Sequence, residues 1–187
     1  MNLINPAYAG AEGSHVFSLT SRNQWNTIED SPKTTGLSYS VSTKNNVGLG
    51  ISIISDKIFI ENQTMLTIDF SYKLTLSNDG VIFLGIKGGG NSYNADPTPL
   101  VSFSKIPDPA QKSLSRFNPN MGVGFLFKMV GVWLSGSMPR LFNTKRDDDI
   151  EIQSRDRINI YLAGGTQFRI SEDFSIRPNL MYRKGKG

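Results

Sequence analysis

Few residues in this sequence have the types and spacing that chemistry requires. His15 is the sole histidine among the 187 residues, and the chain has no cysteine. A Ser–His–Asp arrangement would have to use His15, yet no Gly-x-Ser-x-Gly sequence accompanies it. The lack of cysteine removes thiolate nucleophiles, disulfides and cysteine-ligated metals. We therefore predict no catalytic residues, no cofactor and no enzyme activity.

Two further clusters could bind ligands, and simpler interpretations fit both. Asp147, Asp148 and Asp149 supply the oxygen atoms that calcium prefers, but they lack the alternating spacing of an EF-hand loop. A solvated charged loop is the favoured interpretation. The glycine run at residues 88–90 is not followed by Gly-Lys-Ser or Gly-Lys-Thr, so it does not predict a phosphate loop. It is typical of a bulge or of close packing at a strand end. The sequence thus predicts no metal site.

The composition restricts the class of protein. Apolar residues make up 38% and charged residues 19% of the chain, which suits one folded domain better than a disordered chain. The longest apolar runs, such as residues 81–86, have about six residues, whereas a membrane-spanning helix needs about 20. The net charge of +4 is spread along the whole chain, so binding to nucleic acid is not predicted.

Apolar and polar residues alternate along most of the chain, which is the pattern of half-buried strands. In one run Leu66, Ile68 and Phe70 share one face, while Thr67 and Asp69 share the other. No segment predicts a convincing helix, so the fold class is all-β. Nine strands are predicted, at residues 16–23, 34–41, 47–56, 64–74, 81–91, 120–128, 131–138, 157–162 and 174–183.

The strands and their connections favour an antiparallel transmembrane β-barrel. Several strands reach about ten residues, which is the length that a tilted strand needs to cross a bilayer. Long and short connections alternate, as they do where short periplasmic turns oppose longer extracellular loops. The polar parity would face the lumen and the apolar parity the lipid. A soluble β-sandwich or barrel would show the same alternation, but strand length and loop sorting favour the membrane.

The odd number of strands predicts an incomplete barrel. Bacterial single-chain barrels have an even strand number, and an open sheet in lipid would leave backbone groups unpaired. We therefore expect residues 1–187 to be one β-barrel domain that is truncated at both ends, without its signal peptide and its C-terminal strands. A miscount by one strand is the alternative.

Several short motifs, weak singly, form a specific set when taken in order. The most distinctive is Asn-Pro-Ala-Tyr-Ala-Gly at residues 5–10. Together they resemble the PorP/SprF family, outer-membrane proteins of the type IX secretion system in Bacteroidetes. Phe59 departs from the family, which often has glycine there, and the loop at 92–118 is idiosyncratic. The resemblance spans nearly the whole chain, through residues 5–10, 22–25, 31–34, 46–57, 117–124, 132–139 and 170–178.

The resemblance implies a role without catalysis in the bacterial outer membrane. Members of this family look like partners of secreted proteins, including gliding adhesins, which they recognise through a C-terminal domain during export or surface retention. The expected partners are such a secreted protein, the lipid bilayer and other proteins of the secretion machinery. A passive porin or small-solute channel is the alternative, because a polar, glycine-rich lumen would also permit it. A soluble β-barrel that binds a ligand is a third hypothesis.

Four residues are candidates for contact with a partner. Gln24 and Trp25 end the first predicted strand, where Trp25 could belong to a partner-facing rim or act as an interfacial aromatic anchor. Trp133 permits the same two interpretations. Gly122 and Gly124 share one face of a strand, as Gly48 and Gly50 do, and would leave lumen space for a plug or a partner segment. The proline-rich loop at 92–119 could contact a partner, constrict the lumen or simply vary.

Overall fold

The computed structural model describes residues 1–25, 27–28, 30–76, 79–96, 114–142, 158–171 and 174–185. Within this part of the chain, one 3₁₀ turn, η1 (Pro6–Tyr8), precedes a succession of strands. The strands are β1 (His15–Asn23), β2 (Lys33–Ser42), β3 (Val47–Ile58), β4 (Glu61–Thr75), β5 (Gly80–Ala95), β6 (Leu114–Met129), β7 (Val132–Met138), β8 (Asn159–Thr166), β9 (Phe168–Arg169), β10 (Ser175–Ile176) and β11 (Asn179–Gly185).

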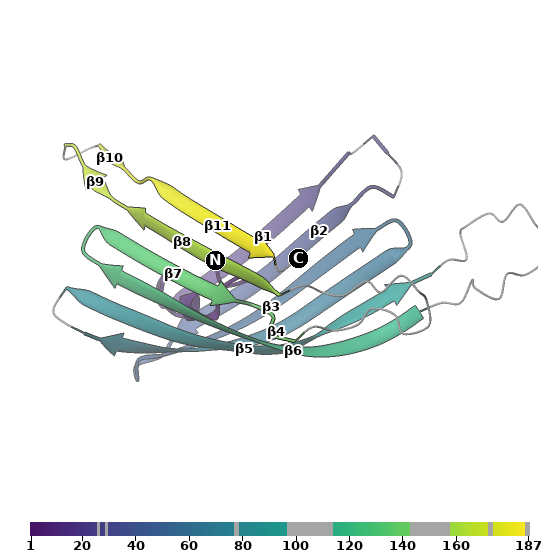
Figure 1. Cartoon of the computed structure of the whole chain (residues 1–187), viewed down its shortest axis with the longest axis horizontal. Coiled ribbons are helices and arrows are strands. Elements are labelled where there is room, and N and C mark those ends of the chain that lie inside the picture. Colours follow the sequence, from purple (N-terminus) through teal and green to yellow (C-terminus); the bar gives the residue numbers. More distant parts are fainter. Residues whose placement is uncertain are drawn as a thin grey trace, which may run out of the picture.

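Nine of these strands form one antiparallel sheet in the order β1-β2-β3-β4-β5-β6-β7-β8-β11. From β1 to β8 each strand pairs with the next one along the chain, β8 pairs with β11, and the sheet curls into a trough whose edge strands rise on either side (Figure 1). The short strands β9 and β10 pair only with each other. This curled half-barrel confirms the predicted all-β antiparallel fold and matches an incomplete β-barrel.

The two faces of the sheet differ as the alternation predicts. On the convex face, large apolar side chains are exposed, and on the concave face small polar side chains are buried. Among the described residues, no helix is long and apolar enough to cross a membrane. The convex face includes Leu37, Leu49, Ile51, Ile53, Leu66, Ile68, Phe70, Tyr72, Leu84, Ile86, Val123, Leu134, Ile160, Leu162 and Leu180, and the concave face Ser38, Ser40, Ser52, Thr67, Asp69, Ser71, Lys87, Ser135 and Ser137.

Strands β5 and β6 are longer than the sequence predicts, because the expected loop at 92–119 is partly strand. Each has 16 residues, and their pairing continues to Ala95 and Leu114. Pro119, which the sequence places at the end of that loop, lies within β6. Met121 accepts a hydrogen bond from Leu141 on the side away from β5, so Pro119 also turns its nitrogen away from β5. The missing N–H therefore removes no bond between β5 and β6.

The connection between the third and fourth predicted strands, expected at residues 57–63, is a two-residue turn. Strand β3 ends at Ile58 and β4 begins at Glu61. Phe59 adopts a φ of 52°, and tight hairpin turns require such a positive φ. The expected alternation of long and short connections is therefore wrong at this position, where a bulky residue takes a conformation that glycine adopts at lower cost.

The ninth predicted strand is interrupted. Residues 174–183 contain the end of the β9–β10 hairpin, then Arg177 and Pro178, and then β11. Pro178 has no N–H to donate to a neighbouring strand, and the predicted strand is interrupted there, between β10 and β11. Ile170 and Ser171, in the β9–β10 hairpin, both donate backbone hydrogen bonds to the Phe174 carbonyl.

Candidate functional site

The N-terminal segment, residues 1–13, lies in the trough on the concave face of the sheet (Figure 1). Its fold begins with the string Asn5-Pro6. The Asn5 side chain caps η1 by accepting a hydrogen bond from the Ala7 backbone N–H at 2.9 Å. Pro6 occupies the first helical position, where a missing N–H costs nothing. The segment thus adopts a defined shape before it contacts the sheet.

A small apolar core fixes the middle of the N-terminal segment. Ala7 and Tyr8 are buried against Phe83 of β5 and Leu126 of β6. The Tyr8 ring meets the Trp133 ring edge to face, with centroids 6.5 Å apart, a favoured aromatic geometry. Trp133 therefore points into the concave side, so its interpretation as an anchor in the membrane interface is wrong.

Asn5 joins the N-terminal segment to two strands at once. Its side-chain amide donates to the Phe125 carbonyl of β6 at 3.0 Å and to the Gly136 carbonyl of β7 at 3.3 Å. Asn5 is 4% exposed. A buried amide that finds all its partners specifies position, because shifting it would leave polar groups without hydrogen bonds.

Lys87 holds the first residues of the segment. Its ammonium donates to the carbonyls of Asn2 and Leu3, both at 3.1 Å, and pairs with Asp69 at 3.1 Å. Lys87 and Asp69 are buried on the concave face, and they oppose each other directly in the register of β4 and β5. Ionised side chains in such a place are retained only when paired and hydrogen-bonded.

Further side chains of the sheet bind the backbone of the segment. Ser71 donates to the Ala9 carbonyl, and Lys128 donates to the Ala11 carbonyl at 2.9 Å. Together with Lys87, these donors contact main-chain oxygens rather than side chains of the segment. The sheet therefore recognises the segment largely through its main-chain carbonyls.

Glycines and a serine in register form a row beneath the segment. Gly48, Ser71, Gly85 and Gly124 are successive partners across β3, β4, β5 and β6. A Cβ added at Gly48 would overlap the Ala9 carbonyl, and one at Gly85 would overlap the Ala7 backbone. One at Gly124 would overlap the Asn5 side chain. These glycines let the segment cross the strands at van der Waals distance. We call this row, with Lys87 and Lys128, the segment groove.

The four predicted partner-binding residues are not brought together. Gln24 and Trp25 lie in the connection after β1, with the Trp25 side chain 67% exposed. Gly122 and Gly124 lie on the concave face of β6, five strands along the sheet order from β1. Pro139 covers Gly122 and Asn5 covers Gly124. The space that these glycines leave is filled by other parts of the same chain.

The other positions singled out in the sequence add nothing to the segment groove. The His15 ring is hydrogen-bonded to the Tyr39 hydroxyl at 2.7 Å on the exposed edge of the sheet. Asp147, Asp148 and Asp149 lie outside the described residues, as do residues 97–113 of the long loop. Within the described ranges, no three histidine, aspartate or glutamate side chains come close enough to hold a metal ion.

Sequence reasoning missed the side chains that hold the segment, namely Asn5, Ser71, Lys87 and Lys128. The string at residues 5–10 was distinctive in the sequence, and Asp69 lay on the polar parity of its strand. What no sequence pattern revealed is the register that puts Gly48, Ser71, Gly85 and Gly124 in one row. Strand partners can be assigned only when the turn lengths are known, and two were misjudged.

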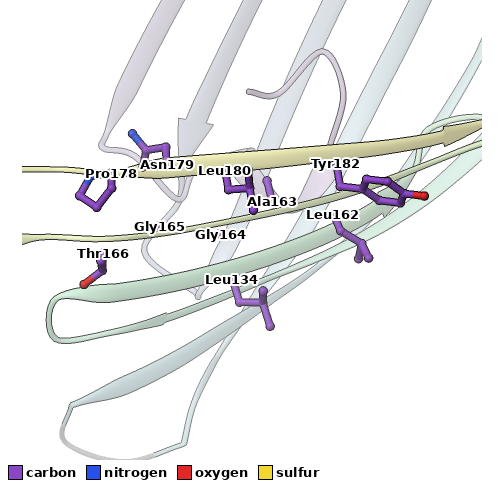
Figure 2. A pocket seen from close by; sticks show the side chains of 10 residues that line it. All are labelled: Leu134, Leu162, Ala163, Gly164, Gly165, Thr166, Pro178, Asn179, Leu180 and Tyr182. Atoms are coloured by element: carbon purple, nitrogen blue, oxygen red, sulfur yellow. The ribbon is translucent and has the colours of Figure 1, made fainter.

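A hollow also lies on the other face of the sheet. It is lined by Leu134 of β7, Leu162 of β8, and Leu180 and Tyr182 of β11, around Gly164, which has no side chain (Figure 2). Its lining is almost wholly apolar and belongs to the convex parity. In a membrane this surface meets lipid, so the hollow lacks the converging polar groups of a specific ligand site.

A family model described as type IX secretion system membrane protein PorP/SprF matches residues 1–187, the whole chain. The chain belongs to this family. No curated protein matches it. PorP/SprF proteins are outer-membrane proteins of the type IX secretion system, and the convex apolar face and polar concave face fit that location. In this PorP/SprF protein, the family motif at residues 5–10 is the part of the N-terminal segment that lies in the segment groove.

Proposed function

We propose that this protein binds a secreted protein, such as a gliding adhesin, through the C-terminal domain of that partner, and aids its export or surface retention. The proposal rests on family membership over the whole chain, which gives a component of the type IX secretion membrane machinery. The role we propose is non-enzymatic. Residues 1–187 would act as a single β-barrel domain beside other proteins of the machinery.

Trp25 is the candidate contact at the rim. Its exposed ring lies in the connection between β1 and β2, beside Gln24, at the end of the sheet where the longer connections gather. Exposed aromatic residues often dominate binding energy in interfaces. We propose that Gly122 and Gly124 contribute indirectly, by accommodating the segments that lie over them.

The deciding experiment is purification of the full-length protein from outer membranes in detergent, with mass spectrometry of what co-purifies. We expect a large secreted protein, recovered through its C-terminal region. Trp25→Ala should lower its recovery. Ile28→Ala, which removes another exposed apolar side chain of the same connection, should not. A clean barrel without a partner would contradict the proposal.

A passive channel is the second candidate, because the concave face is polar. The N-terminal segment occupies that face over β3 to β7, which opposes free diffusion of solutes. Conductance in planar bilayers separates the two. Steady conductance of the purified protein without a partner would favour the channel, and a silent membrane would favour the binding role.

A further inference from the structure

We propose that the segment groove is a peptide-binding site, and that the N-terminal segment is its exchangeable resident. The visitor is a peptide of the same chemistry that folds into the same turns, carried by a partner protein. This inference rests on the proposed function in one respect, since the secreted partner would supply the competing peptide. The groove itself is argued from the contacts that follow.

The groove selects a peptide by its backbone and by small side chains. Ser71, Lys87 and Lys128 bind carbonyl oxygens, which every peptide has. The glycine row allows such close approach that Ala7 and Ala9 are both 0% exposed. A larger side chain at either position would have to displace the sheet. The groove therefore requires small residues where the peptide crosses β3 and β5.

Two positions add specificity to this backbone recognition. The Asn5 amide reaches the carbonyls of Phe125 and Gly136. The Tyr8 ring fills the site between Phe83, Leu126 and Trp133. The fitting pattern is thus asparagine, proline, small, aromatic, small. Recognition of this kind, with main-chain bonds for affinity and pockets for specificity, recurs among peptide-binding proteins.

Two polar pairs of the concave face do not depend on the segment. Lys87 retains its ion pair with Asp69 at 3.1 Å, and the hydroxyls of Ser52 and Thr67 remain 2.9 Å apart in their own hydrogen bond. Exchange therefore leaves no buried charge without its partner. An unpaired buried charge would destabilise the fold strongly. The N-terminal segment also contributes no strand, so its departure breaks no sheet ladder.

A glycine hinge joins the segment to the sheet. Gly10 has a φ of 71° and Gly13 a φ of 149°, just before β1 begins at His15. Such φ values suit glycine and cost other residues strain. No atom lies within 4 Å of the Cβ that Gly13 lacks. The segment can therefore swing about Gly13 while β1 stays in place.

A disulfide can lock the resident in place for the test. A Cβ at Gly50 would lie 3.4 Å from the Ala9 Cβ, close to the separation that a disulfide needs. Because the natural chain has no cysteine, Ala9→Cys with Gly50→Cys can form only this intramolecular bond. The new side chain would also press on the Asn2 amide, 2.7 Å away. Gly50→Ala is therefore the matched control.

The assay measures binding of a fluorescent peptide with the sequence of residues 1–11 to the full chain in detergent micelles, by anisotropy. We expect saturable binding to the Gly50→Ala protein and to the reduced double-cysteine protein. Oxidation should weaken it about tenfold or more, and restoring the thiols should restore it. Replacing asparagine 5 of the peptide by alanine removes two hydrogen bonds and should weaken binding about tenfold.

Absence of saturable binding to the reduced protein would overturn exchange, as would equal binding in the oxidised and reduced states. A second measurement guards against a cysteine pair that folds poorly. In Ser71→Cys, whose position is 1% exposed beneath Ala9, a maleimide should react only when the segment leaves, and the unlabelled peptide should slow the reaction. A thiol that never reacts would show a permanent plug.

The partner experiment separates this inference from the proposed function. If the secreted partner co-purifies with reduced protein and is lost on oxidation, both stand. If it co-purifies equally in both states, the partner binds elsewhere and the groove has another use, which overturns the inference alone. If the peptide exchanges but no secreted partner is ever recovered, the proposed function is wrong, while the groove is still a peptide-binding site.

Discussion

Lys87 and Asp69 show how single residues on the concave face serve two purposes. As register partners, they neutralise each other inside the sheet, and the same ammonium holds two carbonyls of the N-terminal segment. Removing one member is therefore different from removing both. A lone buried charge has no compensation, whereas an apolar pair of similar volume packs without needing any.

Lys87→Met should destabilise the fold strongly, by about 3–5 kcal/mol, because Asp69 is left buried and unpaired. The double variant Lys87→Met with Asp69→Leu should recover most of that loss. Urea unfolding of protein reconstituted in lipid vesicles measures both. Additive losses in the double variant would contradict the reasoning.

Gly85→Ala should displace the N-terminal segment, because the new Cβ would overlap the Ala7 backbone. Overpacking of this kind costs about 1–3 kcal/mol. Gly88→Ala is the control on the same strand, since nothing lies within 4 Å of the Cβ it would add. Limited proteolysis near the N-terminus should speed up for the first variant only, and equal rates would argue against close contact.

At the scale of the elements, strand order and the identity of each face were predictable from the sequence, but strand ends were not. Alternation predicted β4, because Leu66, Ile68 and Phe70 share one face and are all apolar. Alternation predicted only part of β6, because proline is typical of loops. The sequence does not reveal that the nitrogen of Pro119 points away from β5. The turn at Phe59 was missed for a related reason, because its positive φ is invisible in the residue type. The segment groove depends on the register between neighbouring strands. That register cannot be assigned while the start of β6 and the length of the turn at Phe59 are unknown.

The centre of β4 offers a test of the lipid-facing surface. Ile68 is exposed on the convex face, midway along the strand. Ile68→Lys should cost about 2–4 kcal/mol of folding stability in a bilayer. Ser18→Lys, on the exposed concave side of β1, should cost little. Folding into vesicles, followed by gel mobility with and without heating, gives both values, and equal losses would exclude a lipid-facing convex surface.

At the scale of the whole molecule, the trough has two unlike ends. The N-terminal segment and the turn before β3 share one end, and the connections after β1 and β5 share the other. The family places this sheet in the outer membrane. Short turns at one side are typical of the periplasmic end of such barrels, which orients the rim with Trp25 outward.

This orientation can be checked by labelling in intact cells, because the chain lacks cysteine. Trp25→Cys should react with a membrane-impermeant maleimide added outside. Asn45→Cys, in the turn between β2 and β3, should react only after the outer membrane is permeabilised. The reverse labelling pattern would show that the rim with Trp25 faces the periplasm.

The contacts of Asn5 also bear on the order of events during folding. This residue precedes every strand of the sheet in the sequence, yet it binds carbonyls 120 and 131 positions later in the chain. Contacts of such long sequence separation form late, because a large loop must close before they are gained. Ser71 and Lys87 can bind the segment earlier, but the amide of Asn5 can make both of its bonds to the sheet only after β6 and β7 have joined. Burial of Asn5 would then mark the arrival of β7, so protection of this residue reports how far assembly in the membrane has progressed.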